Sequence, residues 1–367
     1  MDKIAVLGGG PAGLSAAIEG AKCGLAVTLF EKSTIGEKIS CAEGFFDTLN
    51  MLGQPKYGVK YKVREILVQM NSCYTFPCDD KMNIWMLDKG EWQKGLAEEA
   101  RSLGVTIMES HPISPAMLND FKTQFDWVID ASGPFSLTSK AYGFNRNYTD
   151  TSAVCAQYVL AGDFSHLAGR LKIGMEESLP GYFWIFPKSN NEANVGICSF
   201  AKLDRNYWRA LDGFLEREGI AGYAKLKKAG GLCPVQKLER LVYDNILLVG
   251  DAAGLVSPLH AAGIDTACIS GKLAVQAIAG QKVSSYEKMI NNALLKKMKA
   301  DKKLYDLWQL IGYNYLENAT DIVANNPEIK VEYSDLFNGN FNLFKNLKYL
   351  RYLPYLKDFI RNARLLG

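Results

Sequence analysis

The sequence lacks a strong excess of charge, a long apolar run and a close cysteine pair. Lysine and arginine number 42 against 39 aspartate and glutamate residues, and the net charge of +3 is too small to indicate nucleic acid as a partner. No uninterrupted apolar segment reaches the ~18 residues that a membrane-spanning helix requires. The eight cysteines include no C-x-x-C pair and follow no secretory signal, so we expect reduced thiols in a cytoplasmic protein.

Histidine is also scarce, with only three residues in the chain. No group of His, Cys and Asp has the spacing of metal ligands, and no Ser–His–Asp pattern stands out, so we predict no metal. The remaining composition, 48% hydrophobic and 22% charged, is typical of a globular protein. A length of 367 residues indicates two domains or a single large one.

The first thirty residues have the pattern of a dinucleotide-binding unit. An apolar strand at Lys3–Leu7 precedes a glycine turn, an Ala-rich helix over Leu14–Cys23 and a second strand at Ala26–Phe30 that ends at Glu31. In such a turn the first glycine permits the bend, the second lets the backbone approach a pyrophosphate and the third lets helix and strand pack closely. These three positions are Gly8, Gly10 and Gly13. Glu31 is placed to bind a ribose diol, but the pattern alone does not separate FAD from NAD.

Two later apolar strands favour a flavin. Phe125–Gly133 runs into a small-residue turn, and Asn245–Gly254 ends in Gly250-Asp251-Ala252-Ala253-Gly254 before a helix expected from Ala262. The second segment resembles the Gly-Asp signature of flavoprotein hydroxylases and their relatives, in which the Asp binds ribityl or ribose hydroxyls and the next helix points its N-terminus at the flavin. A helix N-terminus at that place would stabilise the negative charge of the reduced ring. Asp251 is either a turn residue or a ligand of the cofactor hydroxyls, and the N-terminal pattern favours the second interpretation.

A run of aromatic residues follows in the middle of the chain. In a strand over Leu179–Pro187, alternation puts Tyr182, Trp184 and Phe186 on one face and the intervening residues on the other. Such a face either packs in a core or forms an apolar wall with polar groups on Tyr and Trp.

Together these segments resemble the geranylgeranyl reductase family, a branch of the hydroxylase-type FAD superfamily, over roughly residues 1–290. The matches are the glycine turn with Glu31, the Asp251 loop with Pro258, Gly263 and Ile264, and Leu179–Pro187, which is similar to the family's Pro-x-x-Tyr-x-Trp-x-Phe-Pro signature. The resemblance implies that Tyr182 and Trp184 line an isoprenoid tunnel at the flavin, with Phe186 also contacting substrate. It implies a cofactor site formed by Gly8, Gly10, Pro11, Ala12, Gly13, Glu31, Lys32, Lys38, Lys89, Gly133, Gly250, Asp251, Pro258, Ala262, Gly263 and Ile264.

The chain departs from the family pattern at several places. Pro180 lies one position nearer Tyr182 than the signature requires, and the segment Val105–Phe125 is shorter than the usual peripheral sheet. Ala261 replaces a usual glycine of the flavin loop.

A helix expected over Leu87–Leu103 resembles the superfamily helix whose leading arginine contacts the cofactor, but Lys89 stands at that position, which keeps the charge and loses the bidentate geometry. Lys38 either neutralises a phosphate or reduced flavin or is a solvated surface residue.

Four residues are candidates for catalysis: Cys41, Tyr182, Trp184 and His260. Cys41, in Cys41-Ala42-Glu43-Gly44, resembles a family cysteine close to the flavin and is either a proton donor or redox partner or a small buried side chain. His260 lies in the flavin loop, where it either hydrogen-bonds the flavin or supplies a proton, for which an unperturbed imidazole pKa of ~6.5 would be suited. The alternative is a solvated or structural histidine.

The expected fold class is α/β: a Rossmann-type FAD-binding domain, an inserted antiparallel-sheet substrate domain and a helical C-terminal region. The expected boundaries are 1–62, 84–150 and 236–283 for the first, 63–83 and 151–235 for the second, and 284–367 for the third. Six basic residues and one acid between Lys345 and Arg364 make the end of the chain basic. This segment is either a solvated helix face or a contact with an anionic membrane surface.

These features predict an FAD-dependent oxidoreductase that reduces carbon–carbon double bonds of a polyprenyl lipid. The alternatives are a monooxygenase that hydroxylates an aromatic or apolar small molecule, and a flavin-binding protein without turnover. No second G-x-G-x-x-G is present, which disfavours a separate NADPH domain and leaves NAD(P)H, ferredoxin or free reduced flavin as the electron donor.

Overall fold

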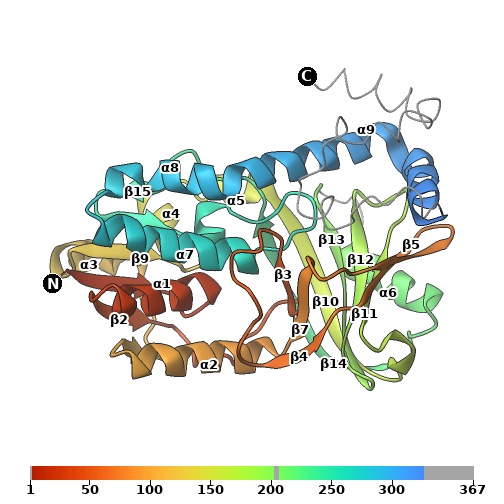
Figure 1. Cartoon of the computed structure of the whole chain (residues 1–367), viewed down its shortest axis with the longest axis horizontal. Helices are drawn as coiled ribbons and strands as arrows, with labels where there is room; N and C mark the ends of the chain where they lie inside the picture. Colours follow the sequence, from red (N-terminus) through yellow and green to blue (C-terminus); the bar gives the residue numbers. More distant parts are fainter. Residues whose placement is uncertain (1, 202–205, 326–367) are drawn as a thin grey trace.

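The computed structural model describes residues 2–201 and 206–325 of the chain, and Figure 1 shows their arrangement. A six-stranded sheet has the order β15-β16-β9-β1-β2-β8, and its strands are parallel except for the β15–β16 pair. Its strands are β1 (Lys3–Leu7), β2 (Ala26–Phe30), β8 (Thr106–Met108), β9 (Trp127–Asp130), β15 (Val242–Tyr243) and β16 (Ile246–Leu248).

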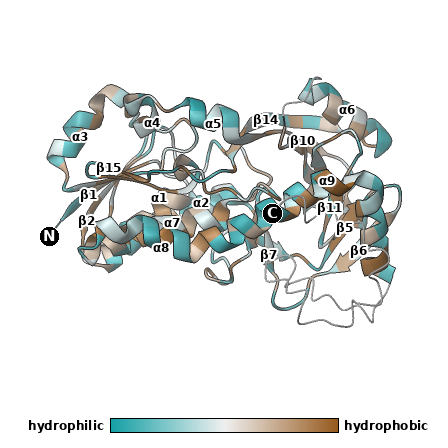
Figure 2. Cartoon of the chain, turned by 90° about the horizontal axis from the view of Figure 1, so that it is seen from above, coloured by the Kyte–Doolittle hydropathy of each residue, from teal (hydrophilic) through white to brown (hydrophobic). Residues whose placement is uncertain are grey.

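Helices cover both faces of this sheet. Figure 2 shows α3, α4 and α5 on one side and α1, α2, α7 and α8 on the other. The bounds are α1 (Pro11–Lys22), α2 (Lys89–Ser102), α3 (Leu118–Gln124), α4 (Leu137–Tyr142), α5 (Arg146–Thr151), α7 (Ile264–Ala279) and α8 (Tyr286–Ile290). α1 and α7 approach closely because Gly271 of α7 has no side chain: a Cβ there would lie 2.3 Å from the carbonyl oxygen of Ala12.

The second half of the molecule contains a seven-stranded sheet of order β14-β10-β13-β12-β11-β5-β6, with helix α6 (Tyr207–Arg217) packed on one face. The strands are antiparallel except for β11 and β5. They are β5 (Glu65–Gln69), β6 (Cys73–Pro77), β10 (Ser152–Ala161), β11 (Arg170–Gly174), β12 (Gly181–Ser189), β13 (Glu192–Ser199) and β14 (Ala224–Pro234).

A small sheet lies between the two halves. Its order is β3-β7-β4, with β3 (Gly44–Asp47), β7 (Asn83–Leu87) and β4 (Val59–Lys62). Helix α9 (Lys296–Asn325) then runs along the top of the molecule in Figure 1, from α8 to the seven-stranded sheet. Its backbone is interrupted at Gly312, where φ is 76°. The predicted fold class is therefore confirmed.

Three helix starts differ from the sequence-based expectation. The helix expected over Leu87–Leu103 begins at Lys89, since Leu87 ends β7 and Asp88 caps the helix by accepting a hydrogen bond from the Glu91 amide at 3.1 Å. α1 begins at Pro11 rather than Leu14, because proline suits the first turn of a helix. α7 begins at Ile264, two residues later than expected.

No helix in the described part of the chain is long and apolar enough to cross a membrane. The basic segment between Lys345 and Arg364 lies outside the described residues. The two interpretations of this segment therefore stay predictions. The expected domain boundaries and the expected cytoplasmic location also stay predictions.

Candidate active site

One continuous cavity of about 1120 Å³ extends from the carboxyl end of the six-stranded sheet to the face of the seven-stranded sheet. Its wall contains the glycine turn after β1, the turn after β9, the loop before α7, the aromatic face of β12 and part of α9. The cavity therefore joins the expected cofactor end to the expected substrate end.

The glycine turn is shaped for a pyrophosphate. A Cβ on Gly13 would lie 1.9 Å from the Gly8 carbonyl oxygen, whereas no heavy atom lies within 4 Å of the corresponding point on Gly10. Gly10 precedes α1, whose first turn has no side-chain cap and no acidic residue. The amides at this helix start are therefore oriented to bind an anion.

The acid after β2 organises the same turn. One Glu31 carboxylate oxygen accepts from the Gly9 amide at 2.7 Å and the other from the Ser33 amide at 3.0 Å. Glu31 also lines the cavity, so its carboxylate is accessible to a ribose hydroxyl.

Asp251 lies on the cavity wall near the start of α7. Burial raises its pKa to about 6, and the charge of Lys89 opposes that shift. α7 has no side-chain cap at Gly263, so its first amides are also oriented toward a ligand. These features fit FAD bound between the two helix starts.

The structure brings most of the predicted cofactor residues to one cavity, although their roles stay predictions. The wall contains Gly8, Gly10, Pro11, Ala12, Glu31, Lys32, Lys38, Lys89, Gly133, Asp251, Ala262, Gly263 and Ile264. Gly13, Gly250 and Pro258 are not on it. Gly13 and Gly250 instead permit close packing, because a Cβ on Gly250 would lie 3.0 Å from that of Ala12.

The aromatic strand lies as alternation predicts. Tyr182, Trp184 and Phe186 of β12 face the cavity, while Phe183 and Ile185 pack in the core beneath α6. The Tyr182 hydroxyl donates to the His260 carbonyl oxygen at 2.6 Å, which ties this strand to the flavin loop. The indole N–H of Trp184 is buried and has no acceptor among the described residues. It is thus available as a donor to a molecule in the cavity.

His260 has an environment that the sequence did not reveal. Burial and nearby Lys297 lower its pKa to about 4, while Asp301 opposes that shift. Its ring stacks on Phe46 at 6.4 Å between centroids. The imidazole is therefore neutral near pH 7, which corrects the expectation of an ordinary pKa and disfavours a role as the proton donor.

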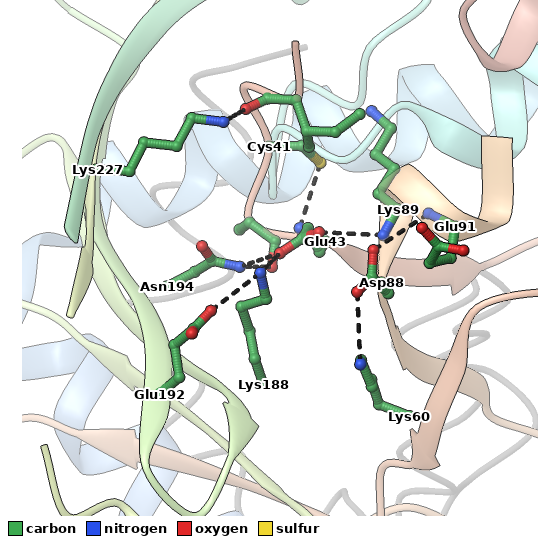
Figure 3. A network of polar contacts seen from close by, with 12 residues as sticks. Cys41, Glu43, Lys60, Asp88, Lys89, Glu91, Lys188, Glu192, Asn194 and Lys227 are labelled. Carbon is green, nitrogen blue, oxygen red and sulfur yellow. Dashed lines mark hydrogen bonds and ion pairs between the residues drawn. The ribbon is translucent and has the colours of Figure 1, made fainter. Parts of the chain in front are cut away.

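Cys41 lies half-buried on the cavity wall. Figure 3 shows it above a network that includes Glu43 and Lys188. The Glu43 amide donates to the Cys41 sulfur at 3.3 Å.

Helix α9 contributes a wall that the sequence did not predict. Its cavity-lining residues are Leu304, Leu307, Trp308, Ile311, Leu316, Ala319, Thr320 and Val323. The spacing of the first four, at i, i+3, i+4 and i+7, is the available signal of an amphipathic face, but it does not identify what that face covers.

Comparison with known proteins agrees with this geometry. Residues 151–231 match the geranylgeranyl reductase catalytic domain, and residues 3–69 match an FAD binding domain. A digeranylgeranylglycerophospholipid reductase of Methanosphaera stadtmanae is 28% identical over 74% of this chain and 73% of its own length. The corresponding reductase of Methanoculleus marisnigri is 29% identical over 74% of this chain and 75% of its own length.

The solved structures support the fold. A geranylgeranyl bacteriochlorophyll reductase-like protein from Thermoplasma acidophilum superposes with a TM-score of 0.75 at 22% identity, covering 98% of this chain and 99% of its own. A flavin-dependent brominase superposes with a TM-score of 0.69 at 15% identity, covering 98% and 99%. The sequence relatives, the two partial family matches and the cavity together show that the chain is an FAD-dependent oxidoreductase similar to the geranylgeranyl reductases.

Proposed function

We propose that this enzyme reduces carbon–carbon double bonds in the isoprenoid chain of a lipid. The observation that carries the proposal is the chemistry of the cavity wall. Its charged residues are Glu31, Lys32, Lys38, Lys89, Lys140 and Asp251, all in the half built on the six-stranded sheet. The described wall formed by β5, β6, β11, β12 and α9 has no Asp, Glu, Lys or Arg. Such a chamber suits a long hydrocarbon and disfavours a charged small molecule.

FAD bound in this cavity and reduced by an electron donor would supply the hydride for this chemistry. The aromatic face of β12 and the apolar face of α9 hold the alkene and exclude water from it. Burial raises the pKa of Tyr182 well above its ordinary value, so its phenol stays protonated. The Tyr182 hydroxyl and the Cys41 thiol are the proposed proton donors to the second alkene carbon, and water is the remaining alternative.

An anaerobic turnover assay tests the proposal. The FAD-loaded protein is reduced with dithionite under argon and mixed with a geranylgeranyl lipid, and the product is analysed by mass spectrometry. We expect a gain of two hydrogen atoms for each double bond reduced. An unchanged lipid under argon, with a hydroxylated product and oxygen uptake in air, would instead establish the monooxygenase alternative.

The same assay identifies the electron donor. Replacing dithionite in turn by NADPH, NADH, reduced ferredoxin or free reduced flavin shows which of them reduces the bound cofactor. Loss of the oxidised flavin spectrum is the direct readout and needs no lipid. A holoprotein that none of these donors reduces would favour the flavin-binding protein without turnover.

A further inference from the structure

The segment that contains Cys41 crosses one end of the seven-stranded sheet, roughly one residue to each strand. Lys227 of β14 donates to the Ile39 carbonyl at 2.6 Å, Gln157 of β10 to the Cys41 carbonyl at 3.0 Å, and Asn194 of β13 to the Ala42 carbonyl at 3.0 Å. These three strands are consecutive neighbours in the sheet, and β12 comes next. Side chains of the seven-stranded sheet, called the substrate sheet below, thus bind the backbone of the segment that contains Cys41.

Glu43 completes the series at β12. Its side chain is buried, and its carboxylate lies 3.0 Å from the Lys188 ammonium of β12. The same carboxylate accepts from the Asn194 amide at 2.9 Å and from the backbone amide of Lys89, the first residue of α2, at 3.0 Å (Figure 3). One side chain therefore connects the Cys41 segment, the substrate sheet and the start of a helix in the FAD-binding half.

The backbone of Glu43 has a conformation that its surroundings must stabilise. Its φ is 66°, a left-handed conformation that residues other than glycine adopt only when their surroundings enforce it. In that conformation its amide faces the Cys41 sulfur at 3.3 Å. We call the contacts of the Glu43 carboxylate with Lys188, Asn194 and the Lys89 amide the Glu43 clamp. The clamp holds the turn at Glu43 in its conformation, and that turn holds the Cys41 thiol in place.

We propose that Glu43 is a positioning residue, which holds the Cys41 thiol at its place in the cavity by binding the Cys41 segment to the substrate sheet. The inference rests on the proposed function for its catalytic consequence, but its structural consequence stands independently. Glu43 itself is not on the cavity wall, so it acts through Cys41 and not by contact with cofactor or lipid.

The variant Glu43→Gln removes the clamp with the smallest change of shape. All three partners of the carboxylate are donors, and glutamine replaces one accepting oxygen with a donating NH₂ that faces them. Lys188 keeps an ion pair with Glu192 at 3.1 Å, so its charge does not become isolated. We therefore expect Glu43→Gln to fold and to bind FAD.

Two readouts follow in the holoprotein. The rate of Cys41 alkylation by iodoacetamide, measured on its tryptic peptide, is expected to rise severalfold because the thiol is no longer held in place. Turnover with the lipid of the proposed reaction is expected to lose about tenfold or more in kcat with KM within about threefold, because misplaced groups affect chemistry more than binding.

Glu192→Gln is the matched control. It removes the other, more exposed carboxylate that contacts Lys188 and touches nothing in the Cys41 segment, so both readouts should stay within about twofold of wild type. Lys188→Met removes the ion-pair partner of Glu43 on the substrate sheet. Its effects on alkylation and turnover should match those of Glu43→Gln, and the double variant should show no further change.

A holoprotein of Glu43→Gln with wild-type alkylation and wild-type kcat would overturn the proposal. If this variant does not accumulate as holoprotein, Lys188→Met decides by the same two readouts. Alkylation of Cys41 does not depend on turnover. If the Glu43→Gln substitution changes the alkylation rate but the wild-type protein reduces no lipid, the proposed function is contradicted, whereas the positioning role of Glu43 is supported.

Discussion

Gly10 and Gly13 lie three residues apart in the turn after β1 but meet different surroundings. Alanine at Gly13 would place its Cβ 1.9 Å from the Gly8 carbonyl oxygen, so Gly13→Ala is expected to lower the free energy of unfolding by about 3 kcal/mol or more. Gly10 has φ −81° and open space at the same point, so Gly10→Ala should change apoprotein stability by less than about 1 kcal/mol.

The effect of Gly10→Ala on FAD affinity should be larger than its effect on stability. Gly10→Ala keeps the fold but puts a methyl group where the pyrophosphate is expected, so its FAD affinity should fall. Urea unfolding of the apoproteins and FAD titration measure both effects. A Gly10→Ala protein with wild-type FAD affinity would contradict the assignment of this turn to the pyrophosphate.

The ionisation of Asp251 makes the stability of the apoprotein depend on pH, and the variant Asp251→Asn removes this contribution. Burial raises its pKa from 3.8 to about 6, so between these values the folded state holds a proton that the unfolded state has released. The resulting loss of stability grows as pH rises from about 4 to about 6 and is fully present above that range. Asp251→Asn should therefore stabilise the apoprotein at pH 7.5 by at most about 3 kcal/mol, and should not stabilise it below pH 4.

The same variant should bind FAD less well. Asparagine loses the charge-assisted acceptance of hydrogen bonds from the cofactor hydroxyls, for which we expect at least about a tenfold loss of affinity. Apoprotein melting curves across this pH range and fluorescence titration with FAD check the two effects. A more stable apoprotein with unchanged FAD affinity would show that Asp251 does not contact the cofactor.

At the scale of elements, α9 offers a test of which wall contacts the lipid. Trp308 lines the cavity, whereas Leu310, two residues further along, is 40% exposed. Trp308→Ala should raise KM for the lipid and leave FAD affinity unchanged, because Trp308 belongs to the apolar wall of the chamber and not to the turns expected to bind the cofactor. Leu310→Ala should change neither quantity. Steady-state kinetics and FAD titration of the two variants decide this.

The elements also show what a sequence can and cannot predict. β1 and β2 begin and end where the local pattern places them, and the alternation of β12 correctly separates its cavity face from its core face. These features depend on neighbours in the chain. The target of α9 depends on tertiary contacts, so its pattern predicts a helix but not a cavity wall.

Glu43 shows the same limit at one side chain. The sequence draws attention to Cys41, but the partners of Glu43 at Lys188 and Asn194 lie about 150 residues away and are brought to it only by the folded sheet. The lowered pKa of His260 has a similar origin, since it comes from burial in the fold and from Lys297 of α9, while Asp301 of the same helix opposes it. Environments built from distant segments were therefore the part of the site that sequence reasoning missed.

At the scale of the whole molecule, the two halves form one cavity with a charged end and an uncharged end. The charged end is shaped for a dinucleotide, and the uncharged end is an apolar chamber under α9. This division explains why the fingerprint residues and the aromatic strand, some 170 residues apart, serve one reaction. In the proposed reaction, electrons pass from the reduced flavin to the lipid within this one cavity.

The most direct test is an anaerobic single turnover followed by the absorbance of the flavin. Holoprotein that has been reduced and freed of excess reductant is mixed with a geranylgeranyl lipid without oxygen. We predict that the oxidised flavin spectrum returns at a rate that depends on lipid concentration, with one double bond saturated for each flavin reoxidised. A flavin that stays reduced in the presence of the lipid, and returns to the oxidised form only when air is admitted, would contradict the account.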